Sequence, residues 1–497
     1  MSEEQKSLKQ IMDFRLEKLE ALRKNGINPY PTKFDPSDCS FTIKSNYSQY
    51  EGKIVKIAGR MIALRKMGKV SFSQIMDCEG KIQIFVKKDH IGDESYANFE
   101  LLDIGDYIGV EGAVFTTKTG EISIRVSTLK ILSKSIRPLP IVKEKNGKIF
   151  DAFTDKEQRY RNRHLDLILN PNVKETFIKR SQIIKSIRMF LDEKGFLEVE
   201  TPILQPLYGG ANARPFTTYH NALNQELYLR IADELYLKRL IIGGLDRVYE
   251  IAKDFRNEGI DRNHNPEFTM LEFYWAYADY EDCMDIVENL IQKTAEKVGA
   301  LKIDWGGKKI DLSKKFEKKP FLTLLEEVTG HDLDDFNENK LRKICEEKGI
   351  EVGKNKNFGQ ILDELMSQLV EPQLIQPTFI IDYPKEISPL AKPHRNGDPN
   401  LVERFELFIG GAEFANSFSE LNDPIDQRQR LNEQKKLRDK GDEEAQPIDE
   451  NFLQAMECGM PPTGGVGLGI DRLTMLLTGN RWIKDVIFFP LLRSDST

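Results

Sequence analysis

A short stretch of charged and aromatic residues concentrates the chemistry of this chain. With a period of two, Arg256 and Glu258 share one face of an expected strand, which ends at Gly259. After a polar loop, a second expected strand adds three side chains to that face: Phe268, Glu272 and Tyr274. Because buried charges are costly unless they are paired or bind a ligand, this hairpin favours a site for a flat polyanion. A solvated hairpin is the alternative.

Two further segments strengthen the first interpretation. The glycine-rich stretch 461–472 predicts a strand that enters an apolar helix, with Arg472 at the helix start. Its glycines lack the register of a dinucleotide-binding fingerprint. They are better explained by a flat ring lying against the backbone. The stretch 195–202 predicts a helix that ends at Gly195, followed by a strand that ends at Pro202.

In this order along the chain, the segments resemble motifs 1, 2 and 3 of the class II aminoacyl-tRNA synthetases. The motif residues are Pro202, then Arg256 with Glu258, then Arg472. Three further runs are similar to lysyl-tRNA synthetases in particular: 228–232, 413–423 and 459–463. The resemblance covers nearly the whole chain. It implies an α+β protein with an N-terminal OB-fold β-barrel and a class II catalytic domain built on an antiparallel sheet flanked by helices.

The length of 497 residues allows about two or three domains. We expect a helical extension at 1–50 and an OB-fold anticodon-binding domain at 51–145. We expect a catalytic domain at 146–497, with a helical insertion at about 285–373. Apolar residues at helical spacing in 3–25 predict an amphipathic helix, most simply one that packs against the body of the protein. Short alternating runs separated by glycines predict a barrel of about five strands.

Composition sets limits on partners and location. The net charge of −7 argues against a nucleic-acid binder, but Glu51 to Lys88 contain nine Lys and Arg against three Asp and Glu. The five cysteines are scattered without Cys-x-x-Cys pairs, which indicates thiols in a reducing cytoplasm and no zinc site. The charged N-terminus lacks an apolar signal core, and no membrane segment is expected. The predicted location is therefore the cytoplasm.

The expected barrel offers a face for single-stranded nucleic acid. Phe72 and Gln83 lie on neighbouring expected strands and Glu121 on a later one. Aromatic stacking with polar contacts to base edges is the usual way to hold such a ligand. From the pattern alone, Phe72 could equally lie in the core. The resemblance assigns Phe72, Gln83 and Glu121 to recognition of the central anticodon base.

Amino-acid activation requires neutralised phosphates and fixed geometry, with no covalent protein nucleophile. The resemblance implies that Arg256 bridges the amino-acid carboxylate and the α-phosphate, and that Arg472 pairs with the γ-phosphate. It also implies ATP contacts from three residues: Glu258, His264 and Phe268.

A Gly-Gly turn at 410–411 would pair Phe408 with Glu413, which makes Glu406 a same-face neighbour of Glu413. Two converging carboxylates repel each other unless a cation lies between them, and hard oxygen ligands next to phosphates suit Mg²⁺. Two solvated glutamates are the alternative.

Specificity for lysine needs carboxylates, because a buried ammonium must be paired. The candidates are Glu234, Glu272 and Glu420, although Glu234 could instead pair with Lys238 on a helix surface. The resemblance adds Gly210, Tyr274 and Asn416 to the lysine site. Strand alternation places Glu413 and Asn416 on opposite faces, so a bulge is needed if both reach the site.

Two positions depart from the family pattern. Asp233 stands where proline is usual, and Asn263 stands where bacterial members often have arginine, which leaves one phosphate contact in doubt.

The hypothesis is a lysine–tRNA ligase that uses ATP, L-lysine, Mg²⁺ and tRNA(Lys), and forms a homodimer as class II architecture implies. An aspartyl- or asparaginyl-tRNA ligase shares the barrel and motifs but should contribute cations to its pocket. A catalytically silent paralogue should lack some of Arg256, Glu406, Glu413 and Arg472, and all are present. A lysine-activating enzyme that modifies a protein would resemble the catalytic domain alone.

Overall fold

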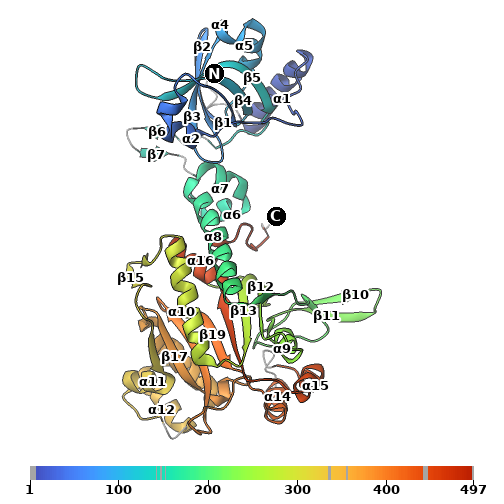
Figure 1. Ribbon diagram of the computed structural model, residues 1–497, viewed down its shortest axis with the longest axis vertical. Coiled ribbons are helices and arrows are strands. Elements are labelled where there is room, and N and C mark those ends of the chain that lie inside the picture. The colour runs from blue at the N-terminus through green and yellow to red at the C-terminus, as the bar shows by residue number, and fades with distance from the viewer. Residues whose placement is uncertain are drawn as a thin grey trace. The chain divides into compact units, whose positions relative to one another are not determined.

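The computed structural model describes residues 7–140, 143–145, 148–150, 153–333, 337–353, 356–439 and 446–494. It contains two compact units, Met1–Thr154 and Asp155–Thr497 (Figure 1). Each unit is described by itself.

Five strands of the first unit close into a barrel in the order β1-β2-β3-β5-β4. They are β1 (Ile54–Met67), β2 (Val70–Met76), β3 (Lys81–Lys87), β4 (Tyr107–Thr116) and β5 (Ile122–Ser133). Alternate residues point inward, as in β3, where Ile82, Ile84 and Val86 are buried. Burial of each such side chain contributes about 1.5–3 kcal/mol. The predicted five-stranded OB-fold barrel is therefore confirmed.

One longer helix, four short helices and a hairpin complete the described part of this unit: α1 (Leu8–Lys24), α2 (Ser40–Ser45), α3 (Tyr47–Tyr50), α4 (Lys88–Ile91), α5 (Asp93–Glu100), β6 (Lys143–Lys145) and β7 (Lys148–Phe150). Helix α1 begins with a capping box formed by Ser7 and Gln10. Its residues Leu19 and Leu22 are buried, and Leu22 belongs to the barrel core. The helix therefore packs against the barrel, as its spacing predicted.

The second unit is built on an eight-stranded sheet in the order β16-β17-β18-β19-β20-β13-β12-β8. In this order the strands are Glu317–Pro320, Thr378–Pro384, Leu401–Ile409, Ala412–Ser419, Thr463–Gly469, Glu267–Ala276, Arg247–Phe255 and Leu197–Glu198. The inner neighbours pair antiparallel, whereas the edge strands β16 and β8 pair parallel. The predicted antiparallel catalytic sheet is confirmed, with mixed edges.

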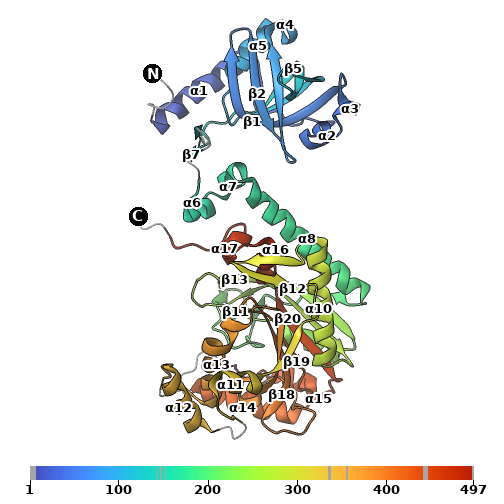
Figure 2. The ribbon, with the colours of Figure 1, turned by 90° about the vertical axis from the view of Figure 1, so that its left-hand side faces the viewer.

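One face of this sheet packs under three helices, α8 (Pro171–Glu193), α10 (Tyr280–Lys297) and α16 (Ile470–Thr478); Figure 2 shows α8 and α10 lying beside it. Leu271 and Phe273 of β13 and Val466 and Leu468 of β20 point into this core. The alternate residues of the same strands therefore point to the opposite face.

The remaining elements of the second unit surround the sheet. Before β13 they are α6 (Lys156–Arg161), α7 (Arg163–Leu169), β9 (Leu204–Gln205), β10 (Thr217–His220), β11 (Gln225–Leu229) and α9 (Glu234–Ile242). After it they are β14 (Lys302–Trp305), β15 (Lys308–Asp311), α11 (Phe321–Thr329), α12 (Glu338–Lys348), α13 (Phe358–Leu365), a π-helical turn (Met366–Val370), two 3₁₀ turns (Glu371–Gln373 and Lys385–Ile387), α14 (Pro424–Asp439), α15 (Glu450–Glu457) and α17 (Ile483–Val486).

The strand predicted to carry Arg256 and Glu258 is shorter than the alternation suggested. β12 ends at Phe255, which pairs with Glu267. The next partner would be Pro266, which lacks the N–H that the ladder needs, and only the Arg256 N–H donates across to its carbonyl, at 2.9 Å. The prediction that both residues lie on the strand is wrong. They lie in the loop that follows it.

Candidate active site

The face of the sheet turned away from the three helices borders a cavity of about 390 Å³. It brings together every residue that the sequence proposed for the catalytic unit: Gly210, Glu234, Arg256, Glu258, His264, Phe268, Glu272, Tyr274, Glu406, Glu413, Asn416, Glu420 and Arg472. These residues come from loops, strands and helices up to 262 positions apart in the sequence, and one concave site contains them all.

The arginines line one end of the cavity. The guanidinium of Arg256 lies 5.2 Å from the centre of the Phe268 ring. Arg472, near the start of α16, donates to the Glu413 carbonyl at 2.7 Å and to Nε2 of His264 at 3.2 Å. The other nitrogen of His264 lies 2.8 Å from the Asp261 carboxylate. Two arginines and an aromatic ring that line one cavity suit the phosphates and base of a nucleotide.

A β-bulge places the glutamates and Asn416 on the same face. Phe408 pairs with Glu413 as predicted, but the preceding residue of β18, Leu407, pairs with Ala415, so Phe414 is extra. Glu406 then pairs directly with Asn416. The structure therefore contains the bulge that the sequence analysis required but could not locate.

The Glu406 carboxyl is held between two polar neighbours. The Tyr383 hydroxyl donates to it at 2.9 Å, and Arg404 forms an ion pair with it at 2.5 Å. Burial raises the pKa of Glu406 to about 7, and repulsion from Glu413 adds to this effect.

Glu371 lies near the same place, and its pKa is also raised to about 7, by burial and by Glu406. Carboxyl groups that raise one another's pKa leave unbalanced negative charge. Their hard oxygen donors, next to the arginine-lined end, fit a divalent cation such as Mg²⁺.

The other end of the cavity carries buried carboxyl groups. Burial raises the pKa of Glu272 and of Glu420, each to about 8. The Tyr274 hydroxyl donates to Glu272 at 3.2 Å. A Cβ at Gly465 would collide with the Glu420 carboxylate and the Tyr274 ring, so β20 needs glycine there. This end therefore suits a cation.

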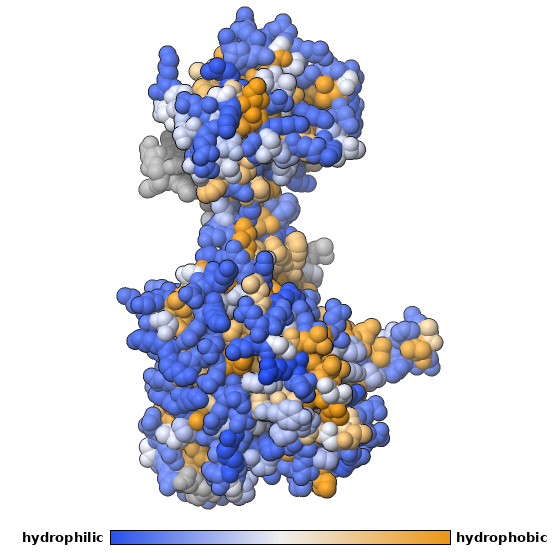
Figure 3. All heavy atoms as spheres, in the orientation of Figure 1, coloured by the Kyte–Doolittle hydropathy of each residue, from blue (hydrophilic) through white to orange (hydrophobic). Residues whose placement is uncertain are grey.

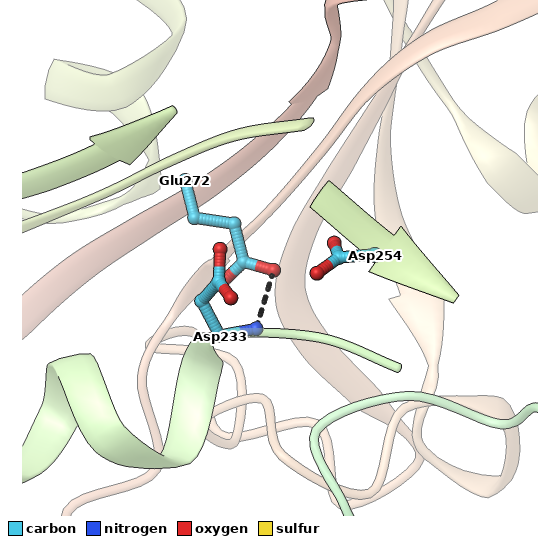
Figure 4. Close-up of side chains that lie close together, drawn as sticks. All are labelled: Asp233, Asp254 and Glu272. Carbon is cyan, nitrogen blue, oxygen red and sulfur yellow. Dashed lines mark hydrogen bonds between the residues drawn. The ribbon is translucent and has the colours of Figure 1, made fainter. Parts of the chain in front are cut away.

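Three carboxyl groups also gather at the back of this end (Figure 4). Asp233 precedes α9, Asp254 lies on β12 and Glu272 on β13, and one oxygen of each lies within 4.8 Å of the others. The Asp233 N–H donates to Glu272 at 3.2 Å. Arg230 forms ion pairs with Asp233 at 3.0 Å and with Asp254 at 3.4 Å.

One arginine is too little charge for this group, because Arg230 also pairs with Glu250 at 2.8 Å. Burial raises the pKa of Asp233 to about 10 and that of Asp254 to about 6. Asp233 therefore keeps a proton at neutral pH, which limits the negative charge of the group.

Two side chains near the site were missed by the sequence analysis or given a different role. Arg404 lines the cavity and contacts Glu406 and Asn416. It stands two residues before Glu406 on β18, so strand alternation could have indicated it. Lys238 pairs with Glu234, as the alternative interpretation proposed, but both are buried and Glu234 still lines the cavity.

In the barrel, Phe72 and Gln83 share the outer, half-buried face of β2 and β3, while their strand neighbours face the core. The Phe72 ring lies 5.1 Å from that of Phe85. Gln83 donates to the Ser123 hydroxyl at 2.8 Å, and Glu121 forms an ion pair with Lys44 at 3.3 Å. Phe72 is thus outside the barrel core.

Comparison with known protein families agrees with both units. Residues 155–493 match the family described as class II tRNA synthetases (D, K and N). The chain belongs to the class II tRNA synthetases. Residues 55–132 of this synthetase match an OB-fold nucleic-acid-binding domain. The family resemblance inferred from the three motifs is confirmed.

Two curated relatives of this class II synthetase extend over almost its full length. The lysine–tRNA ligase of Carboxydothermus hydrogenoformans is 53% identical over 492 residues, which cover 99% of each chain. The lysine–tRNA ligase of Porphyromonas gingivalis strain W83 is 49% identical and is aligned over 97% of this chain and 85% of its own length.

Proposed function

We propose that this class II synthetase is a lysine–tRNA ligase, which activates lysine with ATP as lysyl-adenylate, releases pyrophosphate, and then transfers lysine to the 3′ end of tRNA(Lys). The observation that carries the proposal is a single cavity with arginines at one end and buried carboxyl groups at the other. Such a cavity places a nucleotide and a dibasic amino acid end to end.

In the first step, the lysine carboxylate attacks the α-phosphorus of ATP, a P–O bond forms, and pyrophosphate leaves. Arg256 bridges the two anions and offsets their repulsion, while Arg472 pairs with the γ-phosphate and Phe268 stacks on adenine. Glu258 and His264 contact the nucleotide. No protein atom forms a covalent bond, so the residues act by charge and position.

Glu406 and Glu413 would hold Mg²⁺. A bound Mg²⁺ supplies charge neutralisation for the phosphates. Tyr383 and Arg404 fix the Glu406 carboxyl whether or not the ion is bound, because both contacts come from the protein itself.

Specificity comes from the carboxyl groups. Glu420 with Tyr274 receives the ε-ammonium group, Glu234 with the backbone at Gly210 receives the α-ammonium group, and Asn416 contacts the carboxylate. Glu272 supports this end with its charge. An aspartate or asparagine ligase would need cations or neutral donors here, whereas the lining residues at this end are acidic.

In the second step, the terminal ribose hydroxyl of tRNA attacks the lysyl carbonyl and AMP leaves. The barrel contributes recognition of the anticodon: Phe72 stacks on the central base, and Gln83 and Glu121 contact its edge. Reaction in the cytoplasm agrees with the scattered cysteines.

We further propose a homodimer. Large apolar residues near the motif 1 strand are exposed to solvent: Leu197, Ile203, Leu204, Tyr219 and Leu223. In Figure 3, hydrophobic side chains are visible on the β10–β11 hairpin. An apolar surface of this kind commonly marks an interface.

No described helix has the length and apolar character to cross a bilayer.

ATP–pyrophosphate exchange, run separately with each amino acid, tests the proposal. Lysine should support exchange far better than the other amino acids, and purified tRNA(Lys) should then be charged with lysine. Exchange that depends on aspartate or asparagine would assign the chain to another branch of its family.

A further inference from the structure

The two glutamates assigned to the ammonium groups of lysine already share an ammonium from the protein. Lys238 of α9 is fully buried, and its Nζ lies 2.5 Å from Glu234 and forms an ion pair with Glu420. Lys238 is not among the residues that line the cavity. Its side chain therefore reaches the two carboxylates from behind the pocket, where the Phe452 ring lies 5.9 Å from Nζ.

Within the described part of the chain, Lys238 is the cation that forms ion pairs with these two carboxylates. Neither Glu234 nor Glu420 forms an ion pair with another described residue. The Glu420 oxygens are buried and accept no hydrogen bond from other described groups. The position of the Glu420 carboxylate therefore depends on Lys238.

The other groups that face the pair are acids or neutral. Glu272 and Tyr274 approach from β13, and the pKa of the Cys283 thiol of α10 is raised by burial and by the nearby Glu420 carboxylate. Burial raises the pKa of Glu420, and the negative charge of Glu234 raises it further. Without Lys238, two buried carboxylates would share one proton.

We propose that Lys238 is a positioning residue that determines specificity for lysine: its ammonium holds Glu234 and Glu420 from behind and favours their charged forms, so that both can receive the substrate. The inference rests on the proposed lysine–tRNA ligase function. The Lys238 ammonium is a fixed positive charge in a pocket that selects a positively charged substrate. Together with the charged forms of Glu234 and Glu420 it leaves one net negative charge, which one substrate side chain can balance.

The consequence is a pH dependence of lysine binding. Burial raises the pKa of Glu420 to about 8, although the Lys238 ammonium acts to lower it. Removing that ammonium should raise the pKa further. Lysine must displace the proton of Glu420 to bind. As pH rises toward this pKa, KM for lysine should therefore fall about tenfold per pH unit, and above the pKa it should level off. In wild type the levelling should occur near pH 8.

The experiment measures KM for lysine by ATP–pyrophosphate exchange from pH 6 to 9. In Lys238→Met, KM for lysine should still be falling at pH 9, because the inflection of its pH profile should lie at least one pH unit above that of wild type. KM for ATP should change little. Lys238→Gln is the second variant if the first folds poorly. Lys238→Arg should move the inflection back toward pH 8, and Lys185→Met, on the exposed side of α8, should match wild type.

The double variant Glu234→Gln/Lys238→Met removes one carboxylate together with the ammonium. Its inflection should return toward that of wild type, with weaker lysine binding overall. If folded Lys238→Met and Lys238→Gln keep the wild-type inflection, the role of Lys238 is wrong while the lysine–tRNA ligase function stands. If wild type does not activate lysine at all, the proposed function fails first.

Discussion

The barrel face and the catalytic cavity differ in how far their polar side chains are exposed to water. On the barrel, Gln83 shares with Phe72 a half-buried outer surface above an apolar core, where water can satisfy the Gln83 amide. In the cavity, carboxyl groups such as Glu420 are almost fully buried and have raised pKa values. The barrel face is complete without its ligand, whereas the cavity has unbalanced charge until its ligands bind. Variants in the cavity should therefore have larger, pH-dependent effects.

The largest effect is expected at the centre of the charged pocket. Glu420→Gln should lower kcat/KM for lysine by a hundredfold or more, because loss of a buried countercharge costs about 3–5 kcal/mol. KM for ATP should change little. Pyrophosphate exchange measures both, with Glu296→Gln on the exposed side of α10 as the control. Near-normal activation of lysine by the folded variant would remove Glu420 from the pocket.

The glutamates proposed for Mg²⁺ should give the next largest effect. Glu406→Gln and Glu413→Gln should each shift the Mg²⁺ dependence of exchange to higher concentration, and lower the rate about tenfold or more. In wild type, the pKa of Glu406 near 7 predicts that half-saturating Mg²⁺ rises as pH falls below about 7, since the ion must displace a proton.

Glu406→Gln should lose this pH dependence, and Glu317→Gln, on the exposed edge strand β16, is the matched control. Mg²⁺ titration curves that coincide with those of wild type at every pH would contradict the metal role of these glutamates.

A smaller effect, confined to tRNA, is expected on the barrel. Phe72→Ala and Gln83→Ala should leave lysine-dependent exchange unchanged and reduce charging of tRNA(Lys) about tenfold at subsaturating tRNA, since loss of one base stack costs about 1–3 kcal/mol. Phe41→Ala, at an exposed phenylalanine of α2, is the control. If charging stays normal in both variants, the outer face of β2 and β3 does not bind the anticodon.

The last effect concerns folding, not activity. The raised pKa of Asp233 means that the native state holds a proton that the unfolded state has released, between about pH 4 and pH 10. The free energy of unfolding should therefore fall as pH rises, by up to about 1.4 kcal/mol per unit.

Asp233→Asn should remove that loss, so its thermal midpoint should exceed that of wild type at pH 8 by more than at pH 5. Thermal melts at the two pH values measure the difference, which should be absent in Asp304→Asn on β14. A pH-independent difference would mean that Asp233 is charged in the native state.

The sequence predicted the barrel and the central sheet because each follows from a local pattern, and it predicted the cavity residues from local patterns together with the family resemblance. Alternation assigned Phe268, Glu272 and Tyr274 to one face, and the Gly-Gly turn fixed the pairing of Phe408 with Glu413. The roles of these residues remain predictions.

Other features depended on contacts between distant segments. Lys238 meets Glu420 only after α9 and the end of β19 are brought together, and spacing alone identifies just its partner Glu234. The early end of β12 depended on Pro266, which lies across the ladder and eleven residues after Phe255. The convergence of Asp233, Asp254 and Glu272 likewise requires three elements to meet.

Because of the bulge at Phe414, the number of residues in β19 decides which of its side chains face the cavity. Phe414 and Ala415 both face the helix-packed core, so the strand counts two residues there where alternation allows one. Another apolar side chain at Phe414 would change packing and leave the faces as they are. Deleting the residue would restore strict alternation and turn either Glu413 or Asn416 away from the cavity. The arrangement of the site therefore depends on the number of residues in this strand as well as on their types.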